Sequence, residues 1–248
     1  MIDIIIPIHN ISFDRDISRI KWSVYSLNNQ TIKVNPIVVC SSKDREKRVI
    51  KSILKGFRHT FVSVYDNVLN MPKLHREGFK IGTGEYIGTT GADFIFKQDC
   101  MEKFINKAAE NKFLIKQVRS LPKTTINEKI MNGWMFPNPS ECVRQLKKQG
   151  ERYTWCLNDD GLLGKIANGG LQFAHRKFWE DVCPPPLNMI KLGAYDNYTQ
   201  LCAEKNGLEV EWVAGSQIGH LFHKISSLKF DDQFSKNIKF LNEFKKLV

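Results

Sequence analysis

The chain has 248 residues, of which 42% are hydrophobic and 25% are charged, and its formal net charge is +11. This composition excludes a disordered chain, and the length suits one full hydrophobic core with a smaller part attached. The positive charge predicts attraction to polyanions such as nucleic acid, an anionic membrane surface or a phosphorylated substrate. A solvated, lysine-rich surface that serves no such partner is an equal alternative.

The N-terminal stretch MIDIIIPIHN is apolar over too few residues for a signal peptide and lacks a basic leader. No stretch approaches the roughly 20 apolar residues that a membrane-spanning helix needs. Six cysteines lie far apart with no CxxC pair, which predicts reduced thiols rather than a disulfide framework or a zinc site. We therefore expect a cytoplasmic protein of a bacterium or of a phage-infected cell, not a secreted one.

The first hundred residues alternate apolar runs with helical patterns. Strands are predicted over residues 2–8, 36–40 and 60–66 and from residue 86, and helices over 15–29, 44–57 and 72–83. This alternation predicts an α/β protein with a mostly parallel sheet flanked by helices. Ligands bind beyond the carboxyl ends of the strands in such sheets, and His9, Ser41, Asp66 and Asp93 all follow predicted strands.

The alternation ends after residue 99. Residues 120–168 are rich in Asn, Gly, Pro and Trp, which predicts long structured loops of the kind that often carry function. Beyond them we expect strand and helix pieces at 171–179 and 209–213, and a helix with Asp196 in its first turn. The amphipathic tail over 225–248 is predicted to pack on the domain as a helix, with peripheral contact to a membrane as the alternative.

A single acid, Asp93, lies between two apolar runs in the stretch GEYIGTTGADFIF. A charge in such a place costs several kcal/mol unless it is paired, hydrogen-bonded or bound to a metal. An N-cap or a salt bridge would also explain it.

Five segments, taken together and in order, resemble the family 2 glycosyltransferases of the GT-A fold. They are DIIIPIHN, SLNNQT, HREGFKIGTGEYIGTTGADFIF, GGLQFAHRKFWEDV and AYDNYTQLCAEKNGLEVEWV. The similarity covers about residues 1–100 and 165–223. It implies a nucleotide-sugar-binding half over 1–100, an acceptor-binding and catalytic half over 101–223, and a C-terminal helix over 224–248.

The resemblance also implies a metal site. Asp93 matches the last acid of the family's DXD motif, and His220 or His223 matches a histidine that some members use as a further ligand. A divalent cation would neutralise the charge that develops on the departing diphosphate. Oxygen ligands suit Mg²⁺ or Mn²⁺, and an imidazole shifts the preference toward Mn²⁺. Surface or satisfied core histidines are the alternative for His220 and His223.

Asp196 matches the family's catalytic base, which takes a proton from the acceptor hydroxyl in a single, inverting displacement. A helix N-cap is the alternative role for this residue. The resemblance places the basic side chains of Lys73, His75 and Arg76 near the diphosphate or the nucleobase. The residues expected to contact the nucleotide sugar are Pro7, Ile8, His9, Ser41, Lys73, Arg76, Gly91 and Asp93.

The chain departs from the family pattern at three places. The DXD motif is reduced to Gly91-Ala92-Asp93, the acidic turn after the second strand is Cys40-Ser41-Ser42, and Tyr195 stands where a Glu often precedes the base. A catalytically silent relative that binds nucleic acid or glycan is therefore the alternative to an active transferase.

The acceptor is expected to meet the loops over 120–168. Trp134 and Trp155 are suited to stacking on a sugar or a base, and Asp159 and Asp160 to binding hydroxyls. Basic residues cluster over 43–55 and 144–152, which suits a polyanionic acceptor. Two acceptors stay open: a saccharide of the glycan or lipopolysaccharide type, and a hydroxymethylated DNA base of the phage type.

Overall fold

The computed structural model describes residues 1–9, 14–66, 69–117, 119–120, 170–186, 189, 195–213, 218–220 and 232–246. Within these ranges, no helix is both long enough and apolar enough to cross a membrane.

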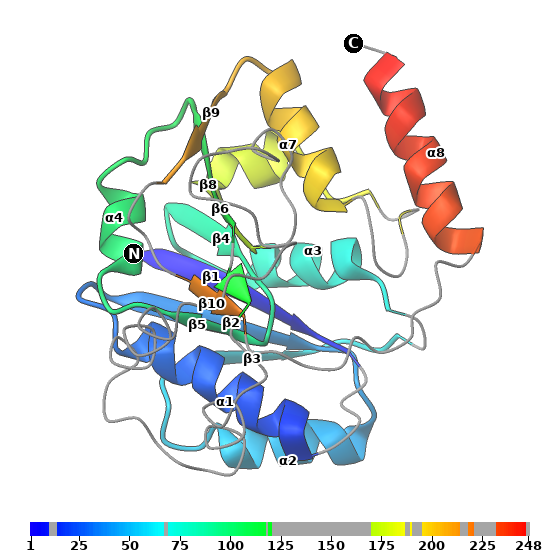
Figure 1. Cartoon of the computed structure of the whole chain (residues 1–248). Coiled ribbons are helices and arrows are strands. Elements are labelled where there is room, and N and C mark those ends of the chain that lie inside the picture. The colour runs from blue at the N-terminus through cyan, green and yellow to red at the C-terminus, as the bar shows by residue number, and fades with distance from the viewer. Residues whose placement is uncertain are drawn as a thin grey trace.

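A seven-stranded sheet forms the centre of the described part of the chain (Figure 1). Its strands, in spatial order, are β3 (Thr60–Ser63), β2 (Val34–Cys40), β1 (Ile2–Ile8), β4 (Tyr86–Thr89), β8 (Gly170–His175), β6 (Lys112–Gln117) and β9 (Glu209–Trp212). Strand β8 runs antiparallel to both of its neighbours, and the other pairs are parallel. The prediction of a mostly parallel α/β sheet is confirmed. We call the edge at which β3, β2, β1 and β4 end the carboxyl edge.

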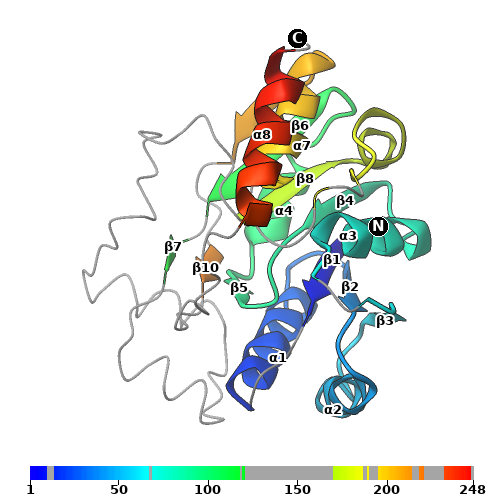
Figure 2. The same ribbon diagram turned by 90° about the vertical axis from the view of Figure 1, so that its right-hand side faces the viewer.

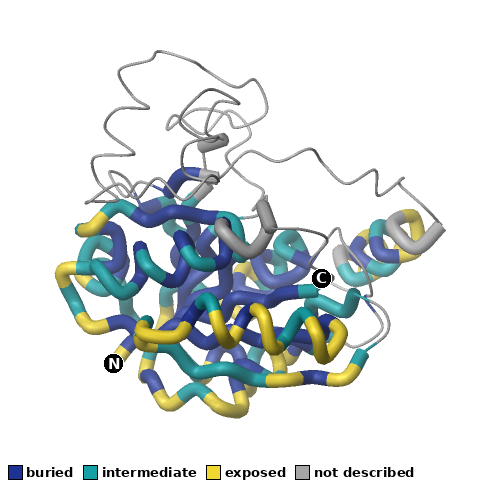
Figure 3. The backbone as a smooth tube through the Cα atoms, turned by 90° about the horizontal axis from the view of Figure 1, so that it is seen from below, coloured by how far each residue is buried: buried dark blue, intermediate teal, exposed yellow. Residues whose placement is uncertain are grey.

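Helices cover both faces of this sheet (Figure 1). One face packs against α1 (Asp14–Asn28), α2 (Asp44–Ile53) and α4 (Cys100–Ile105). The other packs against α3 (Met71–Ile81), the π-helix η1 (Phe178–Val182), α7 (Tyr195–Lys205) and α8 (Asp232–Lys246). Figure 3 shows the buried residues gathered between these layers and the exposed ones on the outer turns.

A separate three-stranded sheet lies beside the main one (Figure 2). Its central strand, β10 (Ile218–His220), pairs antiparallel with β5 (Phe94–Phe96) and parallel with β7 (Arg119–Ser120). Because β5 directly follows Asp93, this sheet fixes the position of the loop that carries the acid.

The C-terminal helix α8 packs along α7, as the amphipathic pattern predicts (Figure 2). The ring of Tyr198 on α7 lies 5.9 Å from that of Phe240 and 4.9 Å from that of Phe244. Leu241 is buried in the same cluster, and the ammonium of Lys205 sits 4.2 Å above the Phe244 ring. The described apolar side chains of α8 therefore pack on the domain itself.

A buried carboxylate joins β1 to the later part of the chain. Asp3 is fully buried and accepts hydrogen bonds from Asn35 Nδ2 (2.8 Å), the Gly84 amide (2.6 Å) and Arg176 (3.3 Å). Arg176, at the end of β8, also donates to the Gly84 carbonyl at 2.8 Å. A side chain at Gly82 would come within 2.6 Å of the Asp3 carboxylate, so this turn needs glycine for close approach.

Replacing Asp3 by Ala should lower the free energy of unfolding by about 3–5 kcal/mol, because Arg176 loses its buried partner. Asn35 and the Gly84 amide lose an acceptor as well. Chemical denaturation measures the change, with Asp181→Ala on the exposed face of η1 as the control. A loss within about 0.5 kcal/mol, the range of ordinary surface changes, would contradict a structural role for the pair.

Candidate active site

The carboxyl edge brings together the side chains that follow β1 and β2. His9 Nδ1 lies 2.7 Å from the Ser41 hydroxyl, and the Ser41 amide donates to the Ile8 carbonyl at 3.0 Å. Pro7 and Ile8 are the last residues of β1. The structure thus brings His9 and Ser41 together at the carboxyl edge, and their contact with a nucleotide sugar stays a prediction.

Burial lowers the pKa of His9 below its ordinary value of 6.5, and the opposing charges of Asp66 and Glu46 only partly offset it. The imidazole is therefore uncharged at neutral pH. A neutral imidazole beside a hydroxyl offers both hydrogen-bond donors and acceptors without a net charge. Such a pair suits the edge of an uncharged ring rather than a phosphate.

The segment after β3 leads into α3 at the same edge. Asn70 caps this helix by accepting from the Lys73 amide at 2.9 Å, and Lys73 Nζ pairs with the Asp66 carboxylate at 3.1 Å. Arg76 is exposed one turn further along α3. A cation held at a helix N-terminus next to a strand end is well placed to meet an anion.

Asp93 lies in the loop between β4 and β5 and is half-buried. Its carboxylate folds back over Gly91, where an added Cβ would come within 2.7 Å of Asp93 Oδ1. The absence of a side chain at position 91, the first position of the reduced DXD motif, is therefore what gives the Asp93 carboxylate its room.

Strand pairing places His220 next to this acid. His220 is opposite Phe94, the residue that follows Asp93, in the antiparallel pair of β10 and β5. The backbone thus brings an Asp and a His to adjacent positions, and these two residue types fit a divalent cation as part of its ligand set. In the part of the chain that the structure describes, no three acidic, His or Cys side chains gather as a complete metal site. His223 lies outside the described residues.

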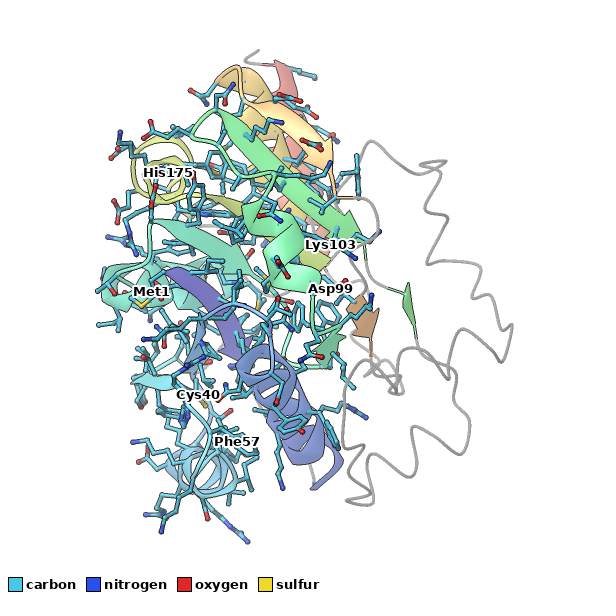
Figure 4. All side chains as sticks on the ribbon, turned by 90° about the vertical axis from the view of Figure 1, so that its left-hand side faces the viewer. Met1, Cys40, Phe57, Asp99, Lys103 and His175 are labelled. Carbon is cyan, nitrogen blue, oxygen red and sulfur yellow. The ribbon has the colours of Figure 1, made fainter. Side chains whose placement is uncertain are left out.

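The SLNNQT stretch holds the segment that follows Asp93. The Ser26 hydroxyl accepts from the Phe96 amide at 3.1 Å, and the Gln30 side chain accepts from the Met101 amide at 2.9 Å and donates to the Lys97 carbonyl at 3.0 Å. Asp99, beside Lys103 in Figure 4, pairs with that lysine at 2.8 Å. The SLNNQT stretch therefore supports the Asp93 loop indirectly, because it fixes β5 and the start of α4.

Asp196 is in the first turn of α7, over the carboxyl edge. Helix α7 leads into β9, which is parallel to β6, so the helix begins at the carboxyl edge and ends at the opposite one. The Gln172 side chain on β8 donates to the Asp196 carbonyl at 2.9 Å, and Gln172 itself is opposite Thr89, the last residue of β4. Asp196 and the Asp93 loop thus both lie where β4 ends. Sequence reasoning missed Gln172, although a Gln within the apolar strand GLQFAH was a signal.

His75 is placed differently from our expectation beside the donor. Its ring is on the buried side of α3, 5.1 Å from the Tyr195 ring and 6.2 Å from the Phe79 ring, and neither of its nitrogens has a hydrogen-bond partner among the described residues. Burial lowers the pKa of His75 to about 3. An uncharged core histidine cannot serve as a cation for a diphosphate.

The residues predicted to bind the acceptor lie outside the described ranges, and their roles stay predictions. They are Trp134, Trp155, Asp159 and Asp160.

Residues 3–156, more than half of the chain, match the family described as "Glycosyl transferase family 2". The chain belongs to glycosyl transferase family 2, as the sequence motifs indicate. No curated protein matches the chain at a significant level.

Solved structures of the GT-A type share the fold. The chain resembles S. aureus TarS with a TM-score of 0.64 at 12% identity, over 97% of this chain and 38% of TarS. It resembles the mannosyltransferase PcManGT from Pyrobaculum calidifontis, in complex with GDP-Man and Mn²⁺, with a TM-score of 0.67 at 13% identity, over 100% and 64% of the two chains. It resembles GalNAc-T7, solved with UDP, GalNAc and Mn²⁺, with a TM-score of 0.68 at 13% identity, over 98% of this chain and 47% of GalNAc-T7. The chain thus spans between 38% and 64% of the length of these three proteins.

Replacing His75 by Phe should make stability less dependent on pH in acid. The unfolded state takes up a proton below pH 6.5 that the folded state refuses down to about pH 3, so the natural chain loses stability as the pH falls through this window. The variant lacks this loss. Between pH 7.5 and pH 5, the free energy of unfolding of the natural chain should therefore fall by about 2 kcal/mol more than that of the variant.

Denaturation at the two pH values measures this difference. Phe79→Leu, which removes no titratable group from the same cluster, should weaken the protein equally at both. Parallel pH profiles for His75→Phe and the natural chain would contradict a buried, neutral imidazole.

Proposed function

We propose that the protein transfers a sugar from a nucleotide-sugar donor to an acceptor hydroxyl. The observation that carries this proposal is that the backbone places two acids near the end of β4: Asp93 in the loop that follows this strand, and Asp196 in the helix turn whose backbone Gln172 holds. Membership of glycosyl transferase family 2 supports the same conclusion.

The donor would lie along the carboxyl edge. His9 and Ser41, with the backbone of Pro7 and Ile8, offer hydrogen bonds suited to the nucleobase. TarS, in a structure of its residues 1–349, was solved with UDP-GlcNAc, and PcManGT was solved with GDP-Man, so proteins of this fold bind more than one nucleobase. Since Ser41 stands in place of an acid here, we do not assign this donor to a uridine nucleotide.

The diphosphate would lie between α3 and the Asp93 loop. Lys73 and Arg76 supply positive charge on one side of it. Asp93 and His220 would hold Mn²⁺ or Mg²⁺ on the other side, and Gly91 leaves space beside the Asp93 carboxylate. When bound, the cation neutralises the charge on the leaving diphosphate. PcManGT and GalNAc-T7, both of the same fold, were solved with Mn²⁺.

Asp196 would act as the general base. An acceptor hydroxyl that attacks the anomeric carbon from the face opposite the diphosphate must lose its proton, and a carboxylate within hydrogen-bond reach takes it. This single displacement inverts the anomeric configuration. The position of Asp196 across the end of β4 from the α3 side of the edge fits this geometry.

The acceptor would be polyanionic, either DNA with hydroxymethylated bases or an acidic glycan. Helix α2 supports this class, because it begins beside the carboxyl edge at the end of β2 and exposes Arg45, Arg48, Lys51 and, just beyond its end, Lys55. Only Asp44 and Glu46 oppose these charges within the helix.

Donor binding should require a divalent cation and Asp93. Titration calorimetry against a panel of sugar nucleotides should show a hit with Mn²⁺ that weakens at least about 10-fold in Asp93→Asn, since the cation loses a charged ligand. Asp181→Asn, an exposed acid on η1, should bind as the natural chain does. Binding of equal strength without any metal would contradict the role of Asp93, and no binding across the panel would favour a silent relative.

Asp196→Asn should keep donor binding and lose transfer. Removing a general base typically lowers the rate by roughly 100- to 10,000-fold, while the isosteric amide leaves the fold intact. Product formation with the donor found above, tested on DNA and on glycans, measures the loss. Full activity in this variant would show that Asp196 only begins the helix.

A further inference from the structure

The role proposed for Asp196 raises the question of what fixes the first turn of α7. A general base must be held within a few tenths of an ångström of its working position, because small misplacements cost large factors in rate. The N-terminal turn of a helix is its least constrained part unless side chains hold it. In this chain one holding side chain, Gln172, comes from the sheet below, and another, Thr199, from the helix itself.

Gln172 occupies a place where an apolar residue would be expected. It lies in the middle of the seven-stranded sheet, between Thr89 of β4 and Ile115 of β6, and only 2% of it is exposed. Its side chain is on the face that carries α3 and α7, where the next residue of the same face, Ala174, is apolar. A buried amide costs free energy unless both of its polar atoms are satisfied.

Both polar atoms of the Gln172 amide are used on α7. Nε2 donates to the Asp196 carbonyl at 2.9 Å, and Oε1 lies 2.8 Å from the hydroxyl of the fully buried Thr199. That hydroxyl is also 2.8 Å from the Asp196 carbonyl, so its single hydrogen serves these two acceptors. The three groups close a small polar cluster around the backbone of Asp196.

We propose that Gln172 and Thr199 are positioning residues for the catalytic carboxylate, and this rests on the function proposed for Asp196. The amide ties the backbone of Asp196 to the strand that is hydrogen-bonded to β4. The carboxylate therefore keeps a fixed relation to the end of β4, from which the Asp93 loop departs. Neither side chain touches substrate, and both act through the direction in which the Asp196 side chain leaves the helix.

The test compares the natural chain with Gln172→Met, which keeps the length of the side chain and removes both hydrogen bonds. Transfer should slow by roughly 10- to 100-fold in kcat. The KM for the donor and the Mn²⁺-dependent donor affinity should stay unchanged. Thr199→Val should show a smaller loss of the same kind, and Thr199→Ser, which restores the hydroxyl, should recover the rate.

Two controls separate positioning from loss of stability. Val24→Ala, a cavity in the buried face of α1, should lower the melting temperature without changing kcat well below that temperature. Gln172→Met combined with Asp196→Asn should be no slower than Asp196→Asn alone, because two residues that act as one unit do not add.

The outcomes are distinct. If the natural chain is active and Gln172→Met leaves its kcat unchanged, this proposal alone is overturned. The same holds if Gln172→Met slows the Asp196→Asn variant as much as it slows the natural chain. A natural chain that binds donors yet transfers nothing overturns the proposed function and this proposal with it.

Discussion

The arrangement of the central sheet depends on the interactions of one buried carboxylate, that of Asp3. It is fully buried, and Arg176, Asn35 and the Gly84 amide together offset the cost of removing its charge from water. These partners come from parts of the chain that are far apart in sequence. Satisfying this one group therefore fixes β8 beside β4 at the edge of the sheet opposite the site.

Strand β8 links that buried charge to the chemistry. Arg176 anchors the strand at one edge, and Gln172, on the same strand, holds the start of α7 at the other. The loop after β4 is held in a comparable way, since Ser26 binds the backbone at the end of β5 and Gln30 binds the backbone beyond it. The acids of the candidate site thus lie on a loop and a helix end, but buried amides and hydroxyls attached to rigid elements set their positions.

The local parts of this architecture could be predicted from sequence, and the long-range parts could not. Apolar runs and helical spacing predicted β1, β2 and α1 because those signals are contained within the elements themselves. The antiparallel insertion of β8 and the pairing of His220 beside Phe94 join segments separated by many residues, and no local pattern encodes such partners. His75 was misplaced for a similar reason, since its neighbour Tyr195 comes from a distant helix.

The insertion of β8 also has a consequence for how the chain is made. Strand β4 ends at Thr89, yet the neighbour that covers its second side begins only at Gly170. During synthesis the ribosome releases the β3-β2-β1-β4 group well before β8, so the side of β4 that ends up in the middle of the sheet is for a time a bare edge. Unpaired strand edges recruit other chains, and pairings between distant segments form slowly. Until β8 emerges, the unpaired side of β4 is therefore open to pairing with other chains.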